Sequence, residues 1–245
     1  MQTILSEKTV REIALEAPLT TRVFEEFKID FCCGGRVPFA EACEKAGVDP
    51  QTVAAKLQPI IDNTTPDDTA AERMGPTDLI NHIVDTHHVF TTLEIRRLVP
   101  LAEKVASRHG ENHPELSEIR DLFIELANEL VVHMKKEEMH LFPYITQLDR
   151  AAKANRMPPM PPFGSVTNPV RVMMFEHDNA GDILRKIRSL SRDFAAPADA
   201  CPSYKGLYAG LEDFERDLHR HIHLENNVLF PQAIELESAS LSVPA

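Results

Sequence analysis

The sequence is poor in tryptophan, glycine and cysteine. It has no Trp, 9 Gly and 4 Cys among 245 residues. A disulfide scaffold needs a higher density of cysteines, and two of the four, Cys32 and Cys33, are adjacent and could close only a strained ring. Hydrophobic residues make up 43% of the chain, which is enough for a sizeable core. The composition predicts an all-α protein, and the sparse cysteines predict a cytoplasmic one.

Long apolar runs and an excess of basic charge are also absent. No stretch approaches the roughly 18 apolar residues that a membrane helix needs, and the N-terminal residues mix charged with apolar side chains, unlike a secretory signal. Lys and Arg number 26 against 38 Asp and Glu, a formal net charge of -12. Because an acidic chain repels phosphate backbones and anionic lipid headgroups, we expect no nucleic acid and no membrane among its partners.

Three polar or proline-rich breaks divide the chain, at 62–76, 154–169 and 195–203. The first has no apolar periodicity and is typical of a linker between domains. It predicts a small helical N-terminal domain over residues 1–62 and a larger helical domain over residues 76–237. In the middle of the small domain, the sequence FCCGGR contains two adjacent glycines that favour a tight turn.

Helical periodicity recurs in four stretches of the larger domain, at 77–108, 114–149, 168–194 and 203–237. Apolar residues follow one another at steps of three and four, which is the stripe that a helix of a four-helix bundle buries. A histidine interrupts each stripe, and a glutamate also interrupts the second and the fourth. These six residues are His88, His133, Glu137, His177, His221 and Glu225.

The second and fourth stretches contain an internal repeat. HMKKEEMHLFP at 133–143 and HIHLENNVLFP at 221–231 share His, Glu, Leu, Phe and Pro in the same register. His88 and His177 precede the two copies by nearly equal chain separations. The pattern indicates two duplicated helix hairpins that face each other about a pseudo-twofold axis, which would place two like metal positions at the centre.

Histidine and glutamate four residues apart lie on one face of a helix, so one pair can direct both side chains to a single site. Neutral imidazole and carboxylate suit iron, manganese or zinc, and ligand type alone does not select among these metals. Two carboxylates can bridge two ions while four histidines cap them, which leaves positions open for reactive chemistry. A single histidine on an apolar stripe is usually structural, but a buried unpaired carboxylate costs several kcal/mol. Because both features occur twice in register, a metal centre is favoured over a purely structural role.

Other polar residues compete for the same role. His87 adjoins His88 near the same stripe and could replace it, and His109, in the first interhelix loop, could cap the site. His140 lies on the ligand face but has Val228 as its counterpart in the repeat, which favours packing at the end of the bundle. The remaining candidates fall off the core faces, and we expect them to be solvated or surface residues: His82, His219, His223 and Glu138.

The adjacent thiols of Cys32 and Cys33 form a separate candidate site. Free cysteines are often inert apolar residues. Next to two glycines and Arg36, however, we expect this pair to be exposed and partly thiolate, as a redox or iron-transfer site requires. Cys43 and Cys201 have no such context.

With DFCCGG at 30–35, EHDNAG at 176–181 and the two repeats, the sequence resembles the family of iron–sulfur cluster repair di-iron proteins. The resemblance covers nearly the whole chain. Its small N-terminal domain would contain the cysteine pair, and a hemerythrin-like four-helix bundle would follow. The metal ligands would be the six residues identified above, with Glu137 and Glu225 as bridging carboxylates of an oxo-bridged centre of two iron ions.

The resemblance also implies a function. Such a protein would be a cytoplasmic homodimer that repairs iron–sulfur clusters damaged by nitrosative or oxidative stress, with Cys32 and Cys33 in redox or iron transfer. Its partners would be damaged iron–sulfur proteins and small gaseous ligands such as nitric oxide or dioxygen. The alternative is a hemerythrin-like protein that binds or reduces nitric oxide or dioxygen, so whether the protein is an enzyme stays open.

Overall fold

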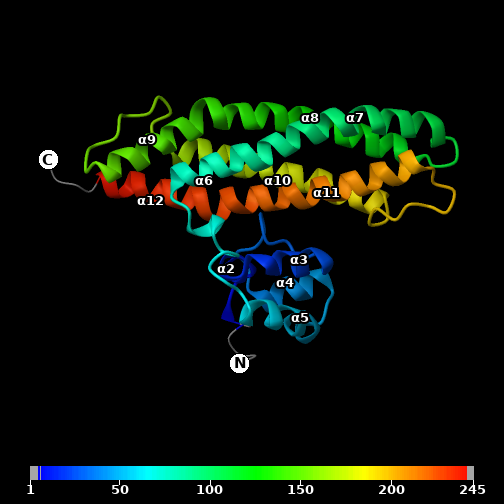
Figure 1. Ribbon diagram of the computed structural model, residues 1–245, viewed down its shortest axis with the longest axis horizontal. Helices are drawn as coiled ribbons and strands as arrows, with labels where there is room; N and C mark the ends of the chain where they lie inside the picture. Colours follow the sequence, from blue (N-terminus) through cyan, green and yellow to red (C-terminus); the bar gives the residue numbers. More distant parts are fainter. Residues whose placement is uncertain (1–4, 6, 242–245) are drawn as a thin grey trace.

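The computed structural model describes Leu5 and residues 7–241, and within them the chain is helical (Figure 1). The only strand-like pairing among these residues is an isolated bridge between Thr9 and Pro38. The helices of residues 76–241 form four long segments. These segments make an elongated bundle, and a smaller group of helices packs against its middle (Figure 1). The predicted all-α fold, a four-helix bundle preceded by a small helical unit, is confirmed.

Each long segment of the bundle is one helix or several in unbroken succession. The first contains α6 (Pro76–His82), the π-helical turn η3 (Ile83–His88) and α7 (Val89–His109); the second contains α8 (Glu115–Lys136), η4 (Glu137–Leu141) and α9 (Phe142–Lys153); the third is α10 (Thr167–Leu190); the fourth contains α11 (Pro202–Leu224), η5 (Glu225–Leu229) and α12 (Phe230–Leu241). A π turn holds one residue more than an α turn and is frequent at functional sites. All three π turns contain a predicted metal ligand.

The predicted breaks fall at the ends of these segments, except that α10 ends at Leu190, four residues before the predicted end of its stretch at 194. Pro76 and Pro202 stand at the first positions of α6 and α11, where a missing N–H costs nothing. After α10, three consecutive residues, Arg192, Asp193 and Phe194, have left-handed backbone conformations with φ between 51° and 59°. Since L-residues rarely adopt that conformation, this turn ends the helix sharply.

The N-terminal unit, here the described residues up to 62, contains α2 (Val10–Glu16), the 3-10 turn η1 (Pro18–Thr20), α3 (Thr21–Glu26), α4 (Phe39–Ala46) and α5 (Pro50–Asp62). Its helices begin at good caps. At α2, the Thr9 side chain accepts from the N–H of Glu12, whose carboxylate accepts from the N–H of Thr9. At α5, Asp49 caps two backbone N–H groups. The 3-10 turn η2 (Ala71–Arg73) lies in the linker to the bundle.

Two apolar clusters fill the interior, one on each side of a polar layer. The first cluster includes Leu130 of α8 and continues into the N-terminal unit through residues such as Phe31. The second cluster begins at Leu141, on the same helical segment. Between Leu130 and Leu141 lie His133 and Glu137, which are as buried as the apolar residues around them. The predicted ligands therefore form a buried polar layer across the bundle.

Buried carboxylates lock the end of the bundle beyond this layer. Asp149 of α9 accepts hydrogen bonds from the Thr77 hydroxyl of α6 and, at 2.8 Å, from the Lys153 ammonium. Burial alone would raise the pKa of Asp149, but these donors lower it below its usual value. Glu237 of α12 accepts from the Tyr144 hydroxyl at 2.9 Å and from the backbone that leads into α10.

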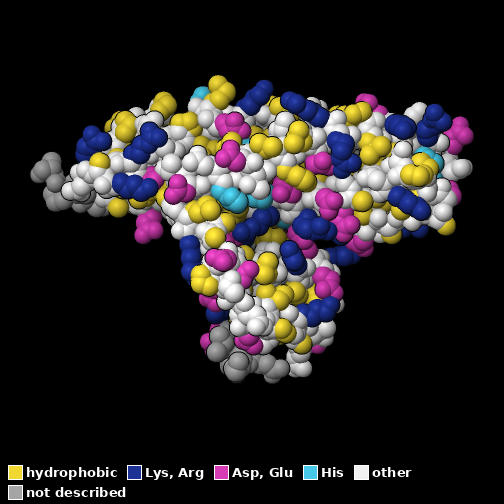
Figure 2. Space-filling view, viewed as in Figure 1, with side chains coloured by type: hydrophobic (Ala, Val, Ile, Leu, Met, Phe, Trp, Pro, Cys, Tyr) yellow, Lys and Arg dark blue, Asp and Glu magenta, His cyan; other side chains and the backbone are white. Residues whose placement is uncertain are grey.

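Basic and acidic side chains alternate over the face of the molecule shown in Figure 2, and a few histidines reach the surface near the N-terminal unit. Within the described part of the chain, no helix combines the length and the hydropathy that crossing a membrane would require.

Candidate metal centre

The structure brings all six predicted ligands together. Two groups of side chains have ligand atoms within 4.8 Å of one another: His88, Glu137, His221 and Glu225 form the first, and His133, Glu137, His177 and Glu225 form the second. Glu137 and Glu225 belong to both groups. Each glutamate is therefore placed where it can bridge two metal positions, with a pair of histidines at each position.

The ring Nε2 atoms point into this layer. His133 Nε2 lies 3.3 Å from Glu137 and His221 Nε2 lies 3.0 Å from Glu225, each on its own helical segment. Across the bundle, His177 Nε2 lies 3.1 Å from Glu225 and 3.0 Å from His133 Nε2. Two ligands bound to one ion at about 2.1 Å are about 3 Å apart, so this spacing fits a shared metal.

The donor set also fits a metal on energetic grounds. Among the described residues, His88 Nε2, both carboxylate oxygens of Glu137 and Glu225 Oε2 are buried without a hydrogen-bond partner. Buried polar atoms are normally paired, because an unmade hydrogen bond costs about 1–3 kcal/mol. Several such atoms converging on one layer are explained if a cation binds between them.

The electrostatics of the layer keep its carboxylates ionised. Burial raises the pKa of Glu225, but His221 and His177 beside it bring the pKa well below the usual value. For His133, burial acts in the opposite direction and lowers the pKa. Glu137 and other carboxylates outweigh burial and raise the pKa of His133 to about 10. The layer therefore offers anionic oxygens together with imidazoles that a metal ion can deprotonate on binding.

Acceptors outside the layer hold three of the four imidazoles. The Nδ1–H of His88 donates to Glu138 at 2.7 Å, and that of His133 donates to Glu176 at 2.8 Å. The Nδ1–H of His177 donates to the side-chain oxygen of Asn226 at 2.9 Å. Such contacts fix the tautomer, leave Nε2 free for a metal and raise the basicity of the ligand.

The sequence did not reveal these acceptors. Glu138 was expected to be only a surface charge; its side chain is 47% exposed, but it also contacts His88. Because the π turn η4 begins at Glu137, the helical register that placed Glu138 off the ligand face does not apply there. Glu176 and Asn226 are each adjacent in sequence to a predicted ligand, which is the one signal that could have pointed to them.

The competing histidines lie outside the two ligand groups. His87 is buried, and its Nδ1 lies 2.9 Å from Asp217 while its ring stacks on His221. His109 contacts the Cys201 thiol at 3.2 Å. His140 was expected to pack at the end of the bundle, and this is wrong because its side chain is exposed.

His223 was expected to be solvated, and this expectation is also wrong. The side chain is 0% exposed. It faces away from the bundle core, but the N-terminal unit covers it: its ring lies 5.7 Å from the Phe31 ring, and Asn227 contacts its Nδ1 at 3.1 Å. Burial lowers the pKa of His223 to about 3, so the imidazole is neutral.

The thiol loop, residues 30–35, is tightly folded. The Asp30 carboxylate accepts hydrogen bonds from the backbone N–H groups of Cys32 and Cys33, at 3.0 and 2.9 Å. A Cβ atom at Gly35 would lie 2.6 Å from the carbonyl oxygen of Phe31, so the turn requires glycine there. The sequence therefore specifies the turn through an aspartate before the cysteines and a glycine after them.

The two thiols differ in environment. Their Sγ atoms are 3.7 Å apart, and both cysteines are free. Cys33 is partly exposed, whereas Cys32 is buried. The contact with Cys33, burial and the nearby Asp30 raise the pKa of Cys32 well above its usual value. Cys32 therefore does not meet the expectation of an exposed, partly ionised thiol.

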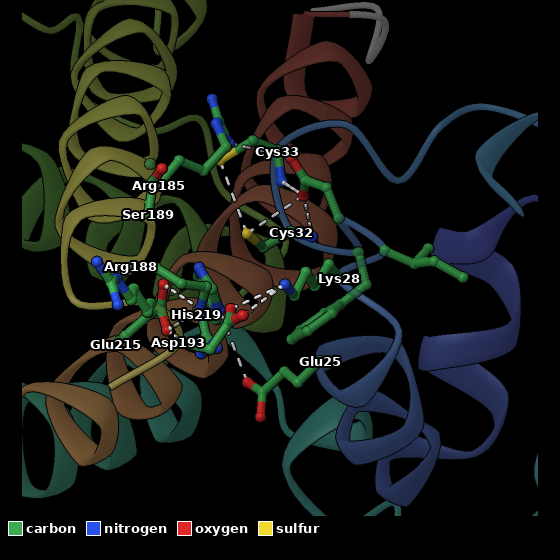
Figure 3. A pocket seen from close by; sticks show the side chains of 15 residues that line it. Glu25, Lys28, Cys32, Cys33, Arg185, Arg188, Ser189, Asp193, Glu215 and His219 are labelled. Atoms are coloured by element: carbon green, nitrogen blue, oxygen red, sulfur yellow. Dashed lines mark hydrogen bonds and ion pairs between the residues drawn. The ribbon is translucent and has the colours of Figure 1, made fainter. Parts of the chain in front are cut away.

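A cavity of about 400 Å³ opens in front of the thiols, between the N-terminal unit and the bundle. Figure 3 shows Cys32 and Cys33 on one side of it and Arg185, Arg188 and Ser189 of α10 on the other. Small molecules can therefore reach Cys33 from this side.

The comparisons with known proteins agree with this architecture. Residues 79–233 match the model of the hemerythrin HHE cation binding domain, and residues 6–60 match the model of the ScdA_N domain, described as a domain of unknown function. The bundle and its buried histidine–glutamate layer thus define a hemerythrin-like, metal-binding protein.

Curated relatives match both parts at once. The iron-sulfur cluster repair protein ScdA of Staphylococcus haemolyticus is 30% identical over 93% of this chain and 98% of its own length. The iron-sulfur cluster repair protein YtfE of Musicola paradisiaca is 34% identical over 95% and 98%. A probable iron-sulfur cluster repair protein of Haemophilus influenzae is 33% identical over 94% and 97%. The chain belongs to this family of iron–sulfur cluster repair proteins, as the sequence motifs predicted.

Proposed function

We propose that this protein repairs iron–sulfur clusters damaged by nitrosative or oxidative stress, by supplying iron held in the buried layer. The observation that carries the proposal is the pair of adjoining ligand groups that share Glu137 and Glu225. The relatives that align with nearly the whole chain are named iron-sulfur cluster repair proteins, which supports the proposal. The finer part of the proposal is two iron ions with an oxo bridge, held by the six ligands His88, His133, Glu137, His177, His221 and Glu225.

Bound iron would supply exchangeable coordination positions, and the protein would supply the rest. The four imidazoles present Nε2 to the layer, while Glu138, Glu176 and Asn226 accept from the Nδ1–H groups of three of them, His88, His133 and His177. The apolar clusters above and below exclude water from the layer. For Cys33, which faces the cavity, we propose a redox or iron-transfer role together with Cys32.

We also propose the organisation that the family resemblance implies. The chain would form two domains, at 1–62 and 76–237, and the separate family matches at 6–60 and 79–233 support this division. It would act as a cytoplasmic homodimer whose partners are damaged iron–sulfur proteins and gaseous ligands such as nitric oxide or dioxygen.

Recovery of activity by an iron–sulfur dehydratase damaged with nitric oxide tests this proposal. The dehydratase is incubated with the iron-loaded protein, with the chelator-stripped protein, and with an iron-loaded Cys32→Ala/Cys33→Ala variant. We expect recovery only with iron-loaded protein, and less recovery with the variant. Replacement of Cys43 and Cys201 is the matched control and should leave recovery unchanged.

Failure of recovery with a fully loaded protein would contradict the proposal. Consumption of nitric oxide measured in the same samples, without any damaged acceptor, would then favour the alternative of a protein that binds or reduces nitric oxide. Recovery by chelator-stripped protein would exclude the ligand layer as the source of iron.

A further inference from the structure

Asn226 lies between the ligand layer and the thiol loop and contacts both. Its side-chain oxygen accepts from His177 Nδ1–H at 2.9 Å, and its side-chain nitrogen donates to the Cys32 carbonyl oxygen at 3.4 Å. The side chain is 3% exposed, so water does not replace these contacts. Two hydrogen bonds therefore connect a predicted metal ligand to the peptide that carries the thiols.

The chemistry of the ligand fixes the direction of both bonds. If His177 binds a metal through Nε2, the proton of the neutral ring is on Nδ1, and Asn226 must present its oxygen to it. The amide nitrogen then faces Cys32 as a donor. A carboxylate at this position could accept from His177 in the same way but could not donate to the loop.

The peptide bond between Cys32 and Cys33 is held from both sides. Asn226 and Asn227 donate to its carbonyl oxygen, at 3.4 and 3.5 Å, and Asp30 accepts from its N–H at 2.9 Å. The orientation of this peptide sets how the two thiols lie relative to each other and to the cavity. These contacts therefore restrain the position of Cys33 relative to the cavity.

The pseudo-twofold repeat shows that this connection is specific to one half of the centre. Glu138 occupies in the first repeat the place that Asn226 occupies in the second, and it accepts from His88 as Asn226 accepts from His177. Glu138 is half exposed and, unlike Asn226, cannot donate a hydrogen bond as a carboxylate. The residue that can both accept and donate, Asn226, is therefore the one whose helical segment faces the N-terminal unit.

We propose that Asn226 is a positioning residue that couples metal occupancy to the reactivity of the cysteine pair. A cation on His177 Nε2 withdraws electron density from the ring and makes Nδ1–H a stronger donor. Hydrogen bonds in series polarise one another, so the amide then holds the Cys32 carbonyl more firmly. Loading the centre restrains the thiol loop, and emptying it releases the loop. This coupling rests on the proposed metal centre.

The test is the rate at which iodoacetamide alkylates Cys33, measured by peptide mass spectrometry on the full chain with Cys201→Ser as background. Each protein is measured chelator-stripped and loaded with Co²⁺, and its metal content is determined separately. In the native sequence, we expect metal to slow alkylation, by no more than the about two- to tenfold that the complete loss of one hydrogen bond of ordinary strength would give.

Asn226→Asp is the decisive variant, because it keeps the acceptor for His177 and removes the donor to Cys32. We expect it to bind Co²⁺ and to react equally fast with and without metal. Asn227→Ala removes a hydrogen bond to the same loop, and Asn227 contacts none of the six candidate ligands. Glu138→Gln changes the residue that accepts from His88 and leaves the contacts of the loop unchanged. Both controls should keep the metal-dependent difference.

Metal binding and the conformation of the thiol loop are coupled in equilibrium, and such a coupling is reciprocal, which provides a second readout. Alkylation of Cys33 should weaken Co²⁺ binding and shift its absorption bands in the native sequence, and should do neither in Asn226→Asp. A metal effect of the same size in Asn226→Asp, or none in the native sequence with the centre loaded, would overturn the coupling alone. Absence of metal binding by the native sequence would overturn the proposed function as well.

Discussion

Replacing Glu137 with leucine would remove one of the two carboxylates that both ligand groups share. The side chain is 0% exposed, and it approaches His133 to 3.3 Å and His88 to 3.4 Å. Without this carboxylate, the pKa of His133 loses its main upward influence, so the imidazole can become neutral. No unpaired charge is then left behind in the layer.

The expected magnitudes separate folding from metal binding. In the metal-free protein, relief from burying a carboxylate and loss of its pairing with His133 oppose each other, and we expect the unfolding free energy to change by less than about 2 kcal/mol. Loss of a ligand common to both positions should weaken metal binding at least about 100-fold. Metal present at 100 times the native Kd stabilises the native sequence by about 2.7 kcal/mol, and a 100-fold weaker Kd leaves about 0.4 kcal/mol. The variant therefore loses about 2.3 kcal/mol of metal-dependent stabilisation, or about 5–9 °C in Tm for a chain of this size.

Metal analysis after gel filtration, circular dichroism and thermal unfolding with and without iron check this prediction together. Glu137→Leu should be helical, nearly metal-free and insensitive to added iron. Glu237→Gln is the matched control, because Glu237 is also buried but accepts its hydrogen bonds outside the layer; it should lower Tm and keep its metal. Full metal occupancy in Glu137→Leu would refute the assignment of this glutamate as a ligand.

Three further changes probe other parts of the molecule. Glu138→Ala removes the acceptor for His88 and should weaken metal binding by about 10- to 100-fold in a competition titration with a chelator, whereas unchanged affinity would reduce Glu138 to a surface charge. Gly35→Ala forces the thiol loop to move and should lower the unfolding free energy by about 1–3 kcal/mol in urea; an unchanged midpoint would contradict the close approach described above. Asp149 has a folded-state pKa below its unfolded value, so its stabilisation is present above about pH 4 and is lost as the pH falls through the folded pKa. Asp149→Asn should therefore be less stable at pH 7 by about 1–3 kcal/mol, and a difference that persists undiminished in acid would contradict the pairing with Lys153.

The sequence was sufficient to predict the helices and the six candidate ligands, whose side chains the structure brings together. Stripes at three- and four-residue spacing are a local property of a helix, so histidines and glutamates that interrupt them can be read without tertiary information. The internal repeat then related Glu137 to Glu225, and in the structure both glutamates belong to both groups of side chains.

What the sequence could not show depends on packing between distant segments. His223 lies off the core face of its helix and is buried under the N-terminal unit, where the Phe31 ring packs beside it. Cys32 is buried because the thiol loop is the part of the N-terminal unit that packs against the bundle. Asn226 has no periodicity that distinguishes it, and its two contacts exist only where helix, ligand and loop meet.

The π turns have a consequence for how such a protein can change during evolution. One residue inserted into an α-helix rotates everything beyond it by about 100°, and a π turn is the form in which a helix absorbs that insertion. In the segment that contains η4, the stripe before Glu137 and the stripe after Leu141 therefore belong to two different registers. The ligand layer lies where the registers meet. Deleting one residue from η4 or η5 would restore a regular helix and turn α9 or α12 away from its packing partners. The segments that carry the glutamates must therefore keep their residue count, a constraint that the loops of the bundle do not share.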